Sequence, residues 1–491
     1  MSPVLLEVKG LKTWLGKKTQ PLRAVDGVDF TIARGETFAL LGESGCGKSM
    51  TALSLLGLNP QPTSRVVAGE IKLLGEDLLS LSELDMQRIR GRRIAMIFQE
   101  PQSSLNPVLS VGEQIGECLQ WHFGLKDQAC HERVIALLDS VGIPDPQQRI
   151  NDYPHQLSGG MKQRVMIAMA LAGEPELLIA DEPTTALDVT IQAQILDLLK
   201  QIQRDTGMAI LLISHDLAVV GQMADHVAVM YAGQIVENAS RERFFNHHKH
   251  PYTDKLFQAL PTERKREQRL TVIKGSVPLL TQTFTGCRFV ERCEHALALC
   301  HTEIPQWYQE DRHGVRCHLF DPDKIIEQKD VPLDLHSSPL SEVLPADKII
   351  LDIKALRVHF PIRKGLFKRV VGHVKAVDDV ALALKQSETL ALVGESGCGK
   401  TTVGKGVLQL VSVTSGEVNY QGHDLTQLSE RELKQHRSSL QIIFQDPFAS
   451  MNPRMTVTQI IEEGLSAKKY VKNPSAKEKR VDELLTRVGL H

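Results

Sequence analysis

The sequence predicts an α/β fold that occurs twice along the chain, with each copy built around a phosphate-binding loop. Residues 42–49 and 394–401 both fit the pattern G-x-x-x-x-G-K-[ST]. Before each loop comes a short apolar run typical of a buried strand, and after the first loop the apolar spacing is that of a helix. Because this pattern binds phosphate when it lies between a strand and a helix, we expect a nucleotide-binding protein built from a repeat.

The first phosphate loop is made of Gly42, Glu43, Ser44, Gly45, Cys46, Gly47, Lys48 and Ser49. Its glycines let backbone N–H groups close around the β-phosphate, and the helix N-terminus adds partial positive charge. We expect Lys48 to reach the β- and γ-phosphates and the Ser49 hydroxyl to ligate Mg²⁺. The same lysine and helix N-terminus favour a thiolate at Cys46.

The second phosphate loop repeats this order with Gly394, Glu395, Ser396, Gly397, Cys398, Gly399, Lys400 and Thr401. The same chemistry predicts ATP binding there, with Thr401 in the place of Ser49 as the Mg²⁺ ligand. Two copies of the pattern in one chain make a chance match untenable.

Length and charge limit the class of protein. A chain of 491 residues is too long for one hydrophobic core and suggests about two to four domains. Its 57 lysines and arginines nearly balance its 59 aspartates and glutamates, so charge gives no reason to expect a nucleic-acid partner. No apolar run approaches the roughly 20 residues of a spanning helix and no signal peptide opens the chain, so we expect a soluble intracellular protein.

Trp14 follows the first strand-like run, at residues 5–8, and lies upstream of the first phosphate loop. Two interpretations remain open for it. The indole could stack on an adenine ring, which makes Trp14 an ATP-binding residue, or it could be a partly buried aromatic of the core.

Gln99 stands at a strand-to-loop junction, after the strand-like run 94–98 and before the turn-forming segment 103–107. That position suits a side chain that touches Mg²⁺ or the attacking water only when the loop is drawn in. Gln445 repeats the arrangement in the second half of the chain, so both glutamines are candidate Mg²⁺ contacts.

Asp181 and Glu182 end the apolar, strand-like run 177–180. Downstream of a phosphate loop, we expect Asp181 to hold Mg²⁺ through water and Glu182 to polarise the attacking water. The alternative is a pair of surface carboxylates at a strand end. His215 comes just after another apolar run, at 210–213, and the carboxyl end of a parallel strand is where such sheets bind ligands.

A second anion-binding helix end is expected where Ser158, Gly159 and Gly160 precede the apolar stretch 165–171. With this element the motifs, taken in order, resemble the nucleotide-binding domain of an ATP-binding-cassette (ABC) protein over residues 1 to about 240. The resemblance rests on Walker A (42–49), the Q-loop (Gln99), the signature LSGG (157–160), Walker B with its glutamate (181, 182), the D-loop (187, 188) and the H-loop (His215).

This resemblance implies a P-loop NTPase with a mostly parallel sheet core, a helical subdomain that carries the signature, and an antiparallel β subdomain. It implies Mg²⁺-dependent ATP hydrolysis in which Glu182 polarises water, His215 contacts the γ-phosphate and Lys48 neutralises charge. In this family two cassettes close head to tail, and each ATP lies between one Walker A and the opposite signature. A second ABC cassette, in this chain or in another copy, is therefore an expected partner.

Segments 98–107, 153–156 and 250–253 resemble the dipeptide, oligopeptide and nickel importers of that family. Two cassettes in one chain resemble the fused ATPases for peptide, microcin or glutathione import. The resemblance implies a peripheral subunit on the cytoplasmic face of the bacterial inner membrane. Two integral-membrane permease subunits and an extracytoplasmic substrate-binding protein would be its partners. The alternative is a soluble ABC ATPase of DNA repair or translation, against which stand the balanced charge and the importer-type segments.

Four cysteines crowd into one loop-rich segment: Cys287, Cys293, Cys300 and Cys317. No C-x₂-C pair occurs, so a zinc ribbon fits poorly, and by spacing alone metal binding and unliganded thiols are both open. The segment resembles the C-terminal extension of peptide-importer ATPases, some of which carry a [4Fe–4S] cluster there. With that resemblance an iron–sulfur cluster comes first, zinc second and free thiols third, and a structural role is favoured over electron transfer.

We therefore expect a first cassette at 1–245, an extension at 246–320, a Pro- and Ser-rich linker at 321–347, and the N-terminal part of a second cassette at 348–491. The second copy reaches His491 before any counterpart of the signature, Walker B, D-loop or H-loop. One chain alone would then lack a complete composite site. Either two chains pair their first halves, or the sequence is a piece of a longer protein, which is the interpretation we favour.

Overall fold

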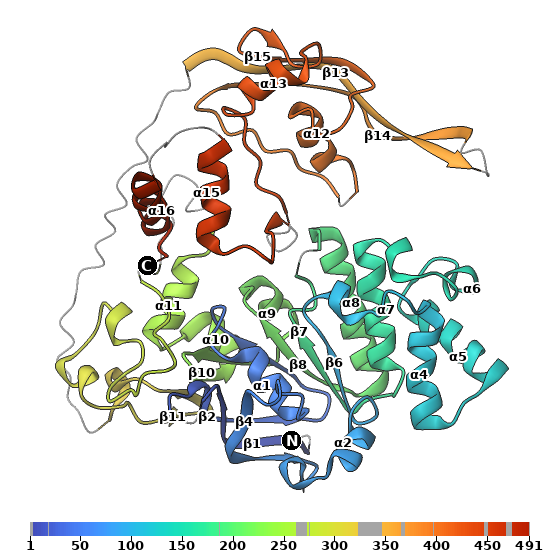
Figure 1. Cartoon of the computed structure of the whole chain (residues 1–491). Coiled ribbons are helices and arrows are strands. Elements are labelled where there is room, and N and C mark those ends of the chain that lie inside the picture. Colours follow the sequence, from blue (N-terminus) through green and yellow to red (C-terminus); the bar gives the residue numbers. More distant parts are fainter. Residues whose placement is uncertain are drawn as a thin grey trace. The chain divides into compact units, whose positions relative to one another are not determined.

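The computed structural model divides the chain into two compact units, Met1–Ser341 and Glu342–His491 (Figure 1). The expected linker lies outside the described residues except at its ends, and so does Ser396 of the second phosphate loop. The structure describes residues 3–17, 19–185, 187–261, 273, 275–322, 346–364, 369–395, 397–445, 450–467 and 474–490.

An eight-stranded sheet organises the first unit, in the order β11-β12-β10-β9-β3-β8-β7-β6. Its parallel part consists of β9 (His226–Tyr231), β3 (Thr37–Leu41), β8 (Ala209–Ser214), β7 (Leu177–Asp181) and β6 (Ile94–Ile97). Every residue of β3, β7 and β8 is buried, as expected for strands covered on both faces. The expected α/β fold with a mostly parallel core is confirmed.

The two faces of this sheet belong to different parts of the core. Alternate residues of a strand point to opposite faces, and in β3 Ala39 and Leu41 join one apolar cluster while Phe38 and Leu40 join the other. The first cluster packs against α4 (Val111–Phe123), α5 (Asp127–Ser140), α7 (Gly159–Leu171), α8 (Val189–Thr206) and α9 (Leu217–Met223). The second packs against α1 (Lys48–Leu55), α2 (Glu83–Ile89) and an antiparallel sheet, as Figure 1 also shows.

The antiparallel sheet has four strands in the order β2-β1-β4-β5. Its members are β1 (Val4–Leu15), β2 (Leu22–Ala33), β4 (Ser64–Leu73) and β5 (Glu76–Asp77), with the 3₁₀ turn η1 (Leu78–Ser80) next in the chain. This sheet is the antiparallel β subdomain that the family resemblance implies. The helical subdomain consists of the helices α3 (Pro101–Ser104) to α7, and it includes α6 (Pro146–Arg149) and the 3₁₀ turn η2 (Pro154–Gln156).

Residues after the first cassette add to its own sheet. Strand β10 (Gln234–Ser240) pairs with β9 on one side and with β12 (His313–Val315) on the other. A buried hydrogen bond between His313 Nε2 and Glu237 Oε1, 2.7 Å apart, joins β12 to β10. The remaining elements are α10 (Arg241–His247), α11 (Pro251–Gln258), η4 (Val290–Arg292), η5 (Ala298–His301), β11 (Tyr308–Glu310) and η6 (His318–Phe320).

The second unit repeats the antiparallel sheet of the first, in the order β14-β13-β15-β16. Its strands are β13 (Ala346–Lys364), β14 (Arg369–Gln386), β15 (Ser415–Tyr420) and β16 (His423–Asp424). Its helices are α12 (Lys400–Val407), α13 (Glu430–His436), α15 (Val457–Ala467) and α16 (Pro474–Arg487). Within the described residues of both units, no helix combines the length and the apolar character that crossing a bilayer requires.

One expectation for the second unit is wrong. The apolar run 390–393, which precedes the second phosphate loop, forms no strand, and Val393 is 85% exposed. Its counterpart β3 is held by hydrogen bonds to the parallel strands β8 and β9. No described residue of the second unit supplies such neighbours, so an isolated apolar run has no sheet to join.

Candidate nucleotide-binding and hydrolysis site

The candidate residues of the first cassette lie at one edge of the parallel sheet. The register pairs Leu41 with Ser214 and Asp181 with Ile213, so β3, β7 and β8 end side by side. Loops leave these carboxyl ends and carry the functional side chains. In strand order they are the phosphate loop after β3, His215 after β8, Glu182 after β7 and Gln99 after β6.

The phosphate loop wraps around the ammonium group of Lys48. Lys48 Nζ donates to the carbonyl oxygens of Gly42, at 2.8 Å, and Glu43, at 3.0 Å. Only glycine fits at Gly47, where φ is 109° and a Cβ would lie 2.1 Å from the Ala24 carbonyl oxygen. The loop is thus a tight backbone cradle that opens helix α1 at its N-terminus, the geometry that binds phosphate.

The second phosphate loop has the same local geometry. Lys400 Nζ donates to the carbonyl oxygens of Gly394 and Glu395, both at 2.6 Å. A Cβ on Gly399 would lie 2.1 Å from the Ala376 carbonyl oxygen. The two Mg²⁺ candidates of this half, Thr401 and Gln445, are both exposed, and no interaction between described residues joins them.

Glu182 is the centre of the predicted catalytic group. Its Oε2 accepts hydrogen bonds from Gln99 Nε2 and Thr185 Oγ1, both at 2.9 Å, and its Oε1 lies 2.9 Å from His215 Nδ1. Its backbone is left-handed, with φ of 47°, a conformation that costs a non-glycine residue free energy. The structure therefore brings together Gln99, Glu182 and His215 from three strand ends.

The electrostatics of the two carboxyl groups differ. Burial raises the pKa of Glu182, but hydrogen bonds from His215 and Thr185 outweigh burial and hold the pKa below its ordinary value. Glu182 is consequently ionised at neutral pH and able to accept a proton. Burial raises the pKa of Asp181, and a hydrogen bond from Ser49 opposes that rise only in part.

Ser49 and Asp181 fit a Mg²⁺ ion. The side chain of Asp181 is 4% exposed, and its Oδ1 is buried with no hydrogen-bond partner. A buried carboxylate oxygen without a partner is costly unless a cation or water binds it. Its neighbour is the Ser49 hydroxyl, and oxygen ligands of this kind are those that Mg²⁺ prefers.

The signature residues lie at the N-terminus of α7. Ser158 caps α7 by accepting from the backbone N–H of Met161 at 3.4 Å, and Ser158 and Gly159 are exposed. Helix α7 packs on one face of the sheet and α1 on the other. Within the described residues no hydrogen bond joins 42–49 to 157–160.

Two sequence interpretations need revision or refinement. A thiolate at Cys46 is wrong, because burial raises the pKa of this fully buried thiol despite the nearby Lys48. The indole of Trp14 is half-buried, and the Arg23 guanidinium lies over its ring, 5.4 Å from the centroid. A cation thus covers one face on which an adenine could stack.

The four cysteines line one enclosed cavity of about 10 Å³, together with the buried His250 and His318. All four are free thiols, and burial raises the pKa of Cys293 to about 11 and that of Cys317 to about 12. In the described part of the chain, no group of three or more His, Cys, Asp or Glu side chains is arranged to hold a metal ion. The arrangement as it stands does not support the expected cluster or zinc.

Sequence reasoning missed Thr185, which bonds Glu182, and two residues that bind the phosphate loop from outside. The backbone N–H of Glu43 donates to Tyr252 Oη at 2.9 Å, and its carboxylate accepts from Arg292. Tyr252 lies in the importer-like segment 250–253 and Arg292 lies between two of the cysteines, so both segments stood out. Their contact with a loop some 200 residues earlier leaves no local signal.

Comparison with known proteins agrees with this geometry. A family profile described as "ABC transporter" matches residues 25–185 and 377–491, which includes both phosphate loops. A second, described as "Oligopeptide/dipeptide transporter, C-terminal region", matches residues 236–300. Fold and site thus define an ATP-binding cassette. The chain belongs to the ABC transporter family and is an ATPase of that type.

Relatives are similar along the whole chain. The Oligopeptide transport ATP-binding protein OppD of Mycobacterium tuberculosis is 39% identical, over 100% of this chain and 80% of its own length. The Glutathione import ATP-binding protein GsiA of Salmonella paratyphi A is 41% identical, over 99% of this chain and 71% of its own. The Uncharacterized ABC transporter ATP-binding protein YejF of Escherichia coli is 39% identical, over 100% and 78%.

Proposed function

We propose that this chain powers the import of peptides or related small solutes through a membrane ABC transporter. The observation that carries the proposal is the joining of Gln99, Glu182 and His215 beside the phosphate loop, which equips the chain to hydrolyse ATP. The match of residues 236–300 to an oligopeptide transporter region supports the substrate class. Relatives named for oligopeptide transport and glutathione import support it further and give no support to a soluble ABC ATPase of another kind.

The residues suggest a division of labour at the first site. Ser49 and Asp181 would hold Mg²⁺, which neutralises charge on the β- and γ-phosphates. Lys48 would add its own positive charge to those phosphates. Glu182, ionised and held by His215, would accept a hydrogen bond from the attacking water and polarise it. His215 would also contact the γ-phosphate.

The exposed signature at the start of α7 supports a composite site. Ser158 and Gly159 are exposed and thus available to another cassette. We infer that ATP binds between the Walker A of one cassette and the signature of a second. The second phosphate loop, residues 394–401, would bind ATP in the same manner. Thr401 and Gln445 would contact Mg²⁺ there.

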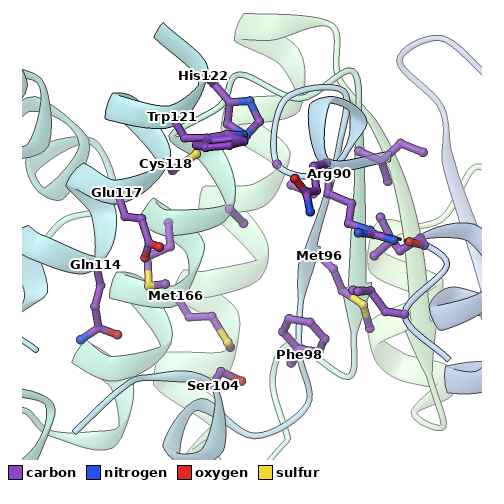
Figure 2. Close-up of a pocket in the computed structure, with 18 of the residues that line it drawn as sticks. Arg90, Met96, Phe98, Ser104, Gln114, Glu117, Cys118, Trp121, His122 and Met166 are labelled. Atoms are coloured by element: carbon purple, nitrogen blue, oxygen red, sulfur yellow. Dashed lines mark hydrogen bonds between the residues drawn. The ribbon is translucent and has the colours of Figure 1, made fainter. Parts of the chain in front are cut away.

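A large apolar cavity is the surface we propose for the permease subunits. It has a volume of about 740 Å³ and lies where α4, α7 and the end of β6 meet. Figure 2 shows Cys118 and Trp121 of α4 on one side, Met96 and Phe98 on the other, and Met166 between them. Trp121 is 67% exposed and lies beside other apolar side chains of the cavity, such as Phe98 and Met96, and contiguous exposed apolar surface is typical of an interaction site.

This cavity could transmit docking to the hydrolysis site. Phe98 lines the cavity, and its neighbour Gln99 bonds Glu182. A permease segment that moved Phe98 would therefore move a partner of the catalytic carboxylate. Such docking would hold the chain on the cytoplasmic face of the bacterial inner membrane, where an extracytoplasmic substrate-binding protein would deliver the solute to the permeases.

The proposal is tested with membranes that contain the chain and its two permease subunits. We expect substrate-loaded binding protein to stimulate ATP turnover, and Trp121→Asp to abolish both stimulation and membrane association while ATP binding survives. Leu279→Asp, which changes an equally exposed leucine outside the cavity, serves as the control and should change neither. Undiminished membrane association of the Trp121 variant would contradict the proposed docking surface.

We further propose that Cys287, Cys293, Cys300 and Cys317 hold a [4Fe–4S] cluster, with zinc as the alternative. Four thiols on one cavity are a suitable donor set, but the cavity of about 10 Å³ would have to open to admit a metal. Anaerobically purified protein should then contain iron, and Cys293→Ser should remove it while ATP binding survives. Protein without iron or zinc would leave the four as free thiols.

A further inference from the structure

The carboxylate of Glu43, inside the first phosphate loop, is gripped by an arginine from the extension. Arg292 Nη1 donates to Glu43 Oε2 at 2.7 Å and Nη2 donates to Oε1 at 3.0 Å. A bidentate pair of this kind fixes direction as well as distance. The Arg292 side chain is 5% exposed and that of Glu43 is 28% exposed, so solvent screens the pair only in part.

Aromatic side chains hold the arginine in place. Arg292 Nη1 also donates to Tyr231 Oη at 3.3 Å, and the guanidinium lies 5.7 Å from the centre of that ring. The rings of Tyr231, Tyr252 and Phe289 pack on one another with centroids 4.7 to 5.4 Å apart. Tyr252 Oη also accepts a hydrogen bond from the backbone N–H of Glu43. The same cluster of side chains therefore binds both the carboxylate and the backbone of Glu43.

The arginine belongs to the turn that carries two of the four cysteines. Residues 287–293 place Cys287 and Cys293 on the cysteine cavity, while Arg288 and Arg292 reach the cassette. Arg288 forms a second tie, pairing with Asp26 and donating to the Ala232 carbonyl oxygen, each at 2.5 Å. The residue after Ala232 donates its backbone N–H to the Cys46 carbonyl oxygen at 2.9 Å. Both arginines therefore act on the phosphate loop or on its direct support.

We propose that Arg292 is a positioning residue for nucleotide binding, through which the turn 287–293 holds the first phosphate loop in its binding shape. The inference rests on the proposed nucleotide site at residues 42–49. Glu43 is a negative charge at the edge of a loop that receives a triphosphate. Arg292 neutralises that charge and orients the residue whose carbonyl oxygen also holds Lys48.

Loss of the arginine should therefore weaken binding more than it slows chemistry. In Arg292→Gln the carboxylate of Glu43 would face the phosphates unpaired, and we expect the ATP dissociation constant to rise about tenfold. Turnover at saturating MgATP should change less than about twofold, because the contacts of Arg292 with other described residues are to Glu43 and Tyr231 and not to Glu182. Adding Glu43→Gln to this variant should restore most of the affinity, since the uncompensated charge is gone.

The experiment measures equilibrium binding of ATP in chains that all carry Lys400→Ala, so that only binding at the first phosphate loop is measured. Arg292→Lys, which keeps the charge but not the bidentate grip, should give an intermediate affinity. The matched control is Arg316→Gln, which removes a half-buried arginine of the extension that contacts Trp307 and the Ile235 carbonyl oxygen. It should leave ATP affinity unchanged.

The possible results distinguish a failure of the positioning role of Arg292 from a failure of the nucleotide site at residues 42–49. Unchanged affinity in Arg292→Gln, or an equal loss in Arg316→Gln, would overturn the positioning role. Failure of Glu43→Gln to restore affinity in the double variant would overturn it as well. If Lys48→Ala did not weaken binding at all, the nucleotide site itself would be misplaced, which is a different failure.

Discussion

Glu182 carries the chemistry that we assign to the first cassette. Three side chains from different loops converge on its carboxylate, and its backbone adopts a left-handed conformation that the surrounding loops must hold. Several hydrogen bonds that fix one carboxylate are expected where the orientation of that carboxylate matters for proton transfer.

Replacing Glu182 by glutamine should separate ATP binding from hydrolysis. The amide keeps the shape but cannot accept a proton, so turnover should fall by at least about two orders of magnitude while ATP affinity stays. The measurement is phosphate release at saturating MgATP, with Glu174→Gln as a control. Glu174 is also a glutamate with positive φ, but it lies on the surface and pairs with Arg133. Wild-type turnover in the Glu182 variant would remove it from its role.

Cysteine reactivity provides a second test at this scale. Cys46 is fully buried and burial raises its pKa, whereas Cys398 of the second loop is exposed. Because the thiolate is the reactive form and needs access, iodoacetamide at pH 8 should label Cys398 well before Cys46. Peptide mapping by mass spectrometry gives the two rates. Faster labelling of Cys46 would show that the first loop opens far more than its contacts indicate.

At the scale of elements, the strand ends explain why so much of the site is readable from sequence. A buried run followed by a polar residue marks the carboxyl end of a parallel strand, and parallel strands place all such ends at one edge. Gln99, Glu182 and His215 were therefore predictable as neighbours. The bidentate pair of Arg292 with Glu43 was not predictable, because it joins segments 249 positions apart through tertiary packing alone.

The second copy shows the limit of reading elements from local pattern. Residues 390–393 have the composition of β3, but a central strand exists only through the strands on both sides of it. The four-cysteine cavity shows the same limit, since its members meet through turns that have no period. The antiparallel sheet, whose strands all lie within residues 4–77 of the first copy and 346–424 of the second, recurs in both units.

The buried hydrogen bond between His313 and Glu237 tests how firmly the extension is attached. Glu237 is 0% and His313 is 2% exposed, and Glu237 also accepts the backbone N–H groups of Lys249 and His250. His313→Ala would leave a buried carboxylate short of a partner, so the first unit should lose about 3 kcal/mol of unfolding free energy in urea. Arg243→Ala, which breaks an exposed pair with Asp311, should cost under about 1 kcal/mol. Equal effects would contradict the importance of the buried pair.

Burial raises the pKa of Glu237, but the hydrogen bonds from His313 and from the backbone N–H groups of His250 and Lys249 outweigh it and lower the pKa below its ordinary value. A carboxyl group with a lowered pKa in the folded state stabilises the fold above its unfolded pKa, and that contribution is lost as pH falls through the folded value. The deficit of His313→Ala should therefore be full near neutral pH and shrink below about pH 4.

At the scale of the whole molecule, one cassette presents a phosphate loop and a signature that do not meet. The phosphate loop leads into α1 on one face of the sheet, and the signature begins α7 on the opposite face. Ser158 of the signature is exposed. Two copies related by a twofold axis could each lend the signature to the other, since a symmetric interface uses the same two surfaces twice. We therefore propose that the residues of the first cassette are half of an ATP-hydrolysing site.

The most direct test is complementation between inactive chains, all carrying Lys400→Ala so that the first loop alone is read. Glu182→Gln removes the catalytic carboxylate and Ser158→Arg blocks the signature, so each variant alone should be inactive. In a mixed pair, the wild-type Walker A and Glu182 of one chain meet the wild-type signature of the other. Random pairing should then restore about a quarter of the turnover of the parent chain.

A mixture of Glu182→Gln with Lys48→Ala is the matched control, because both changes lie on the Walker side and no mixed pair regains an intact site. The account predicts restored turnover in the first mixture and none in the second. Absence of turnover in the first mixture, from chains shown to bind ATP and to associate, would contradict a site shared between two first cassettes.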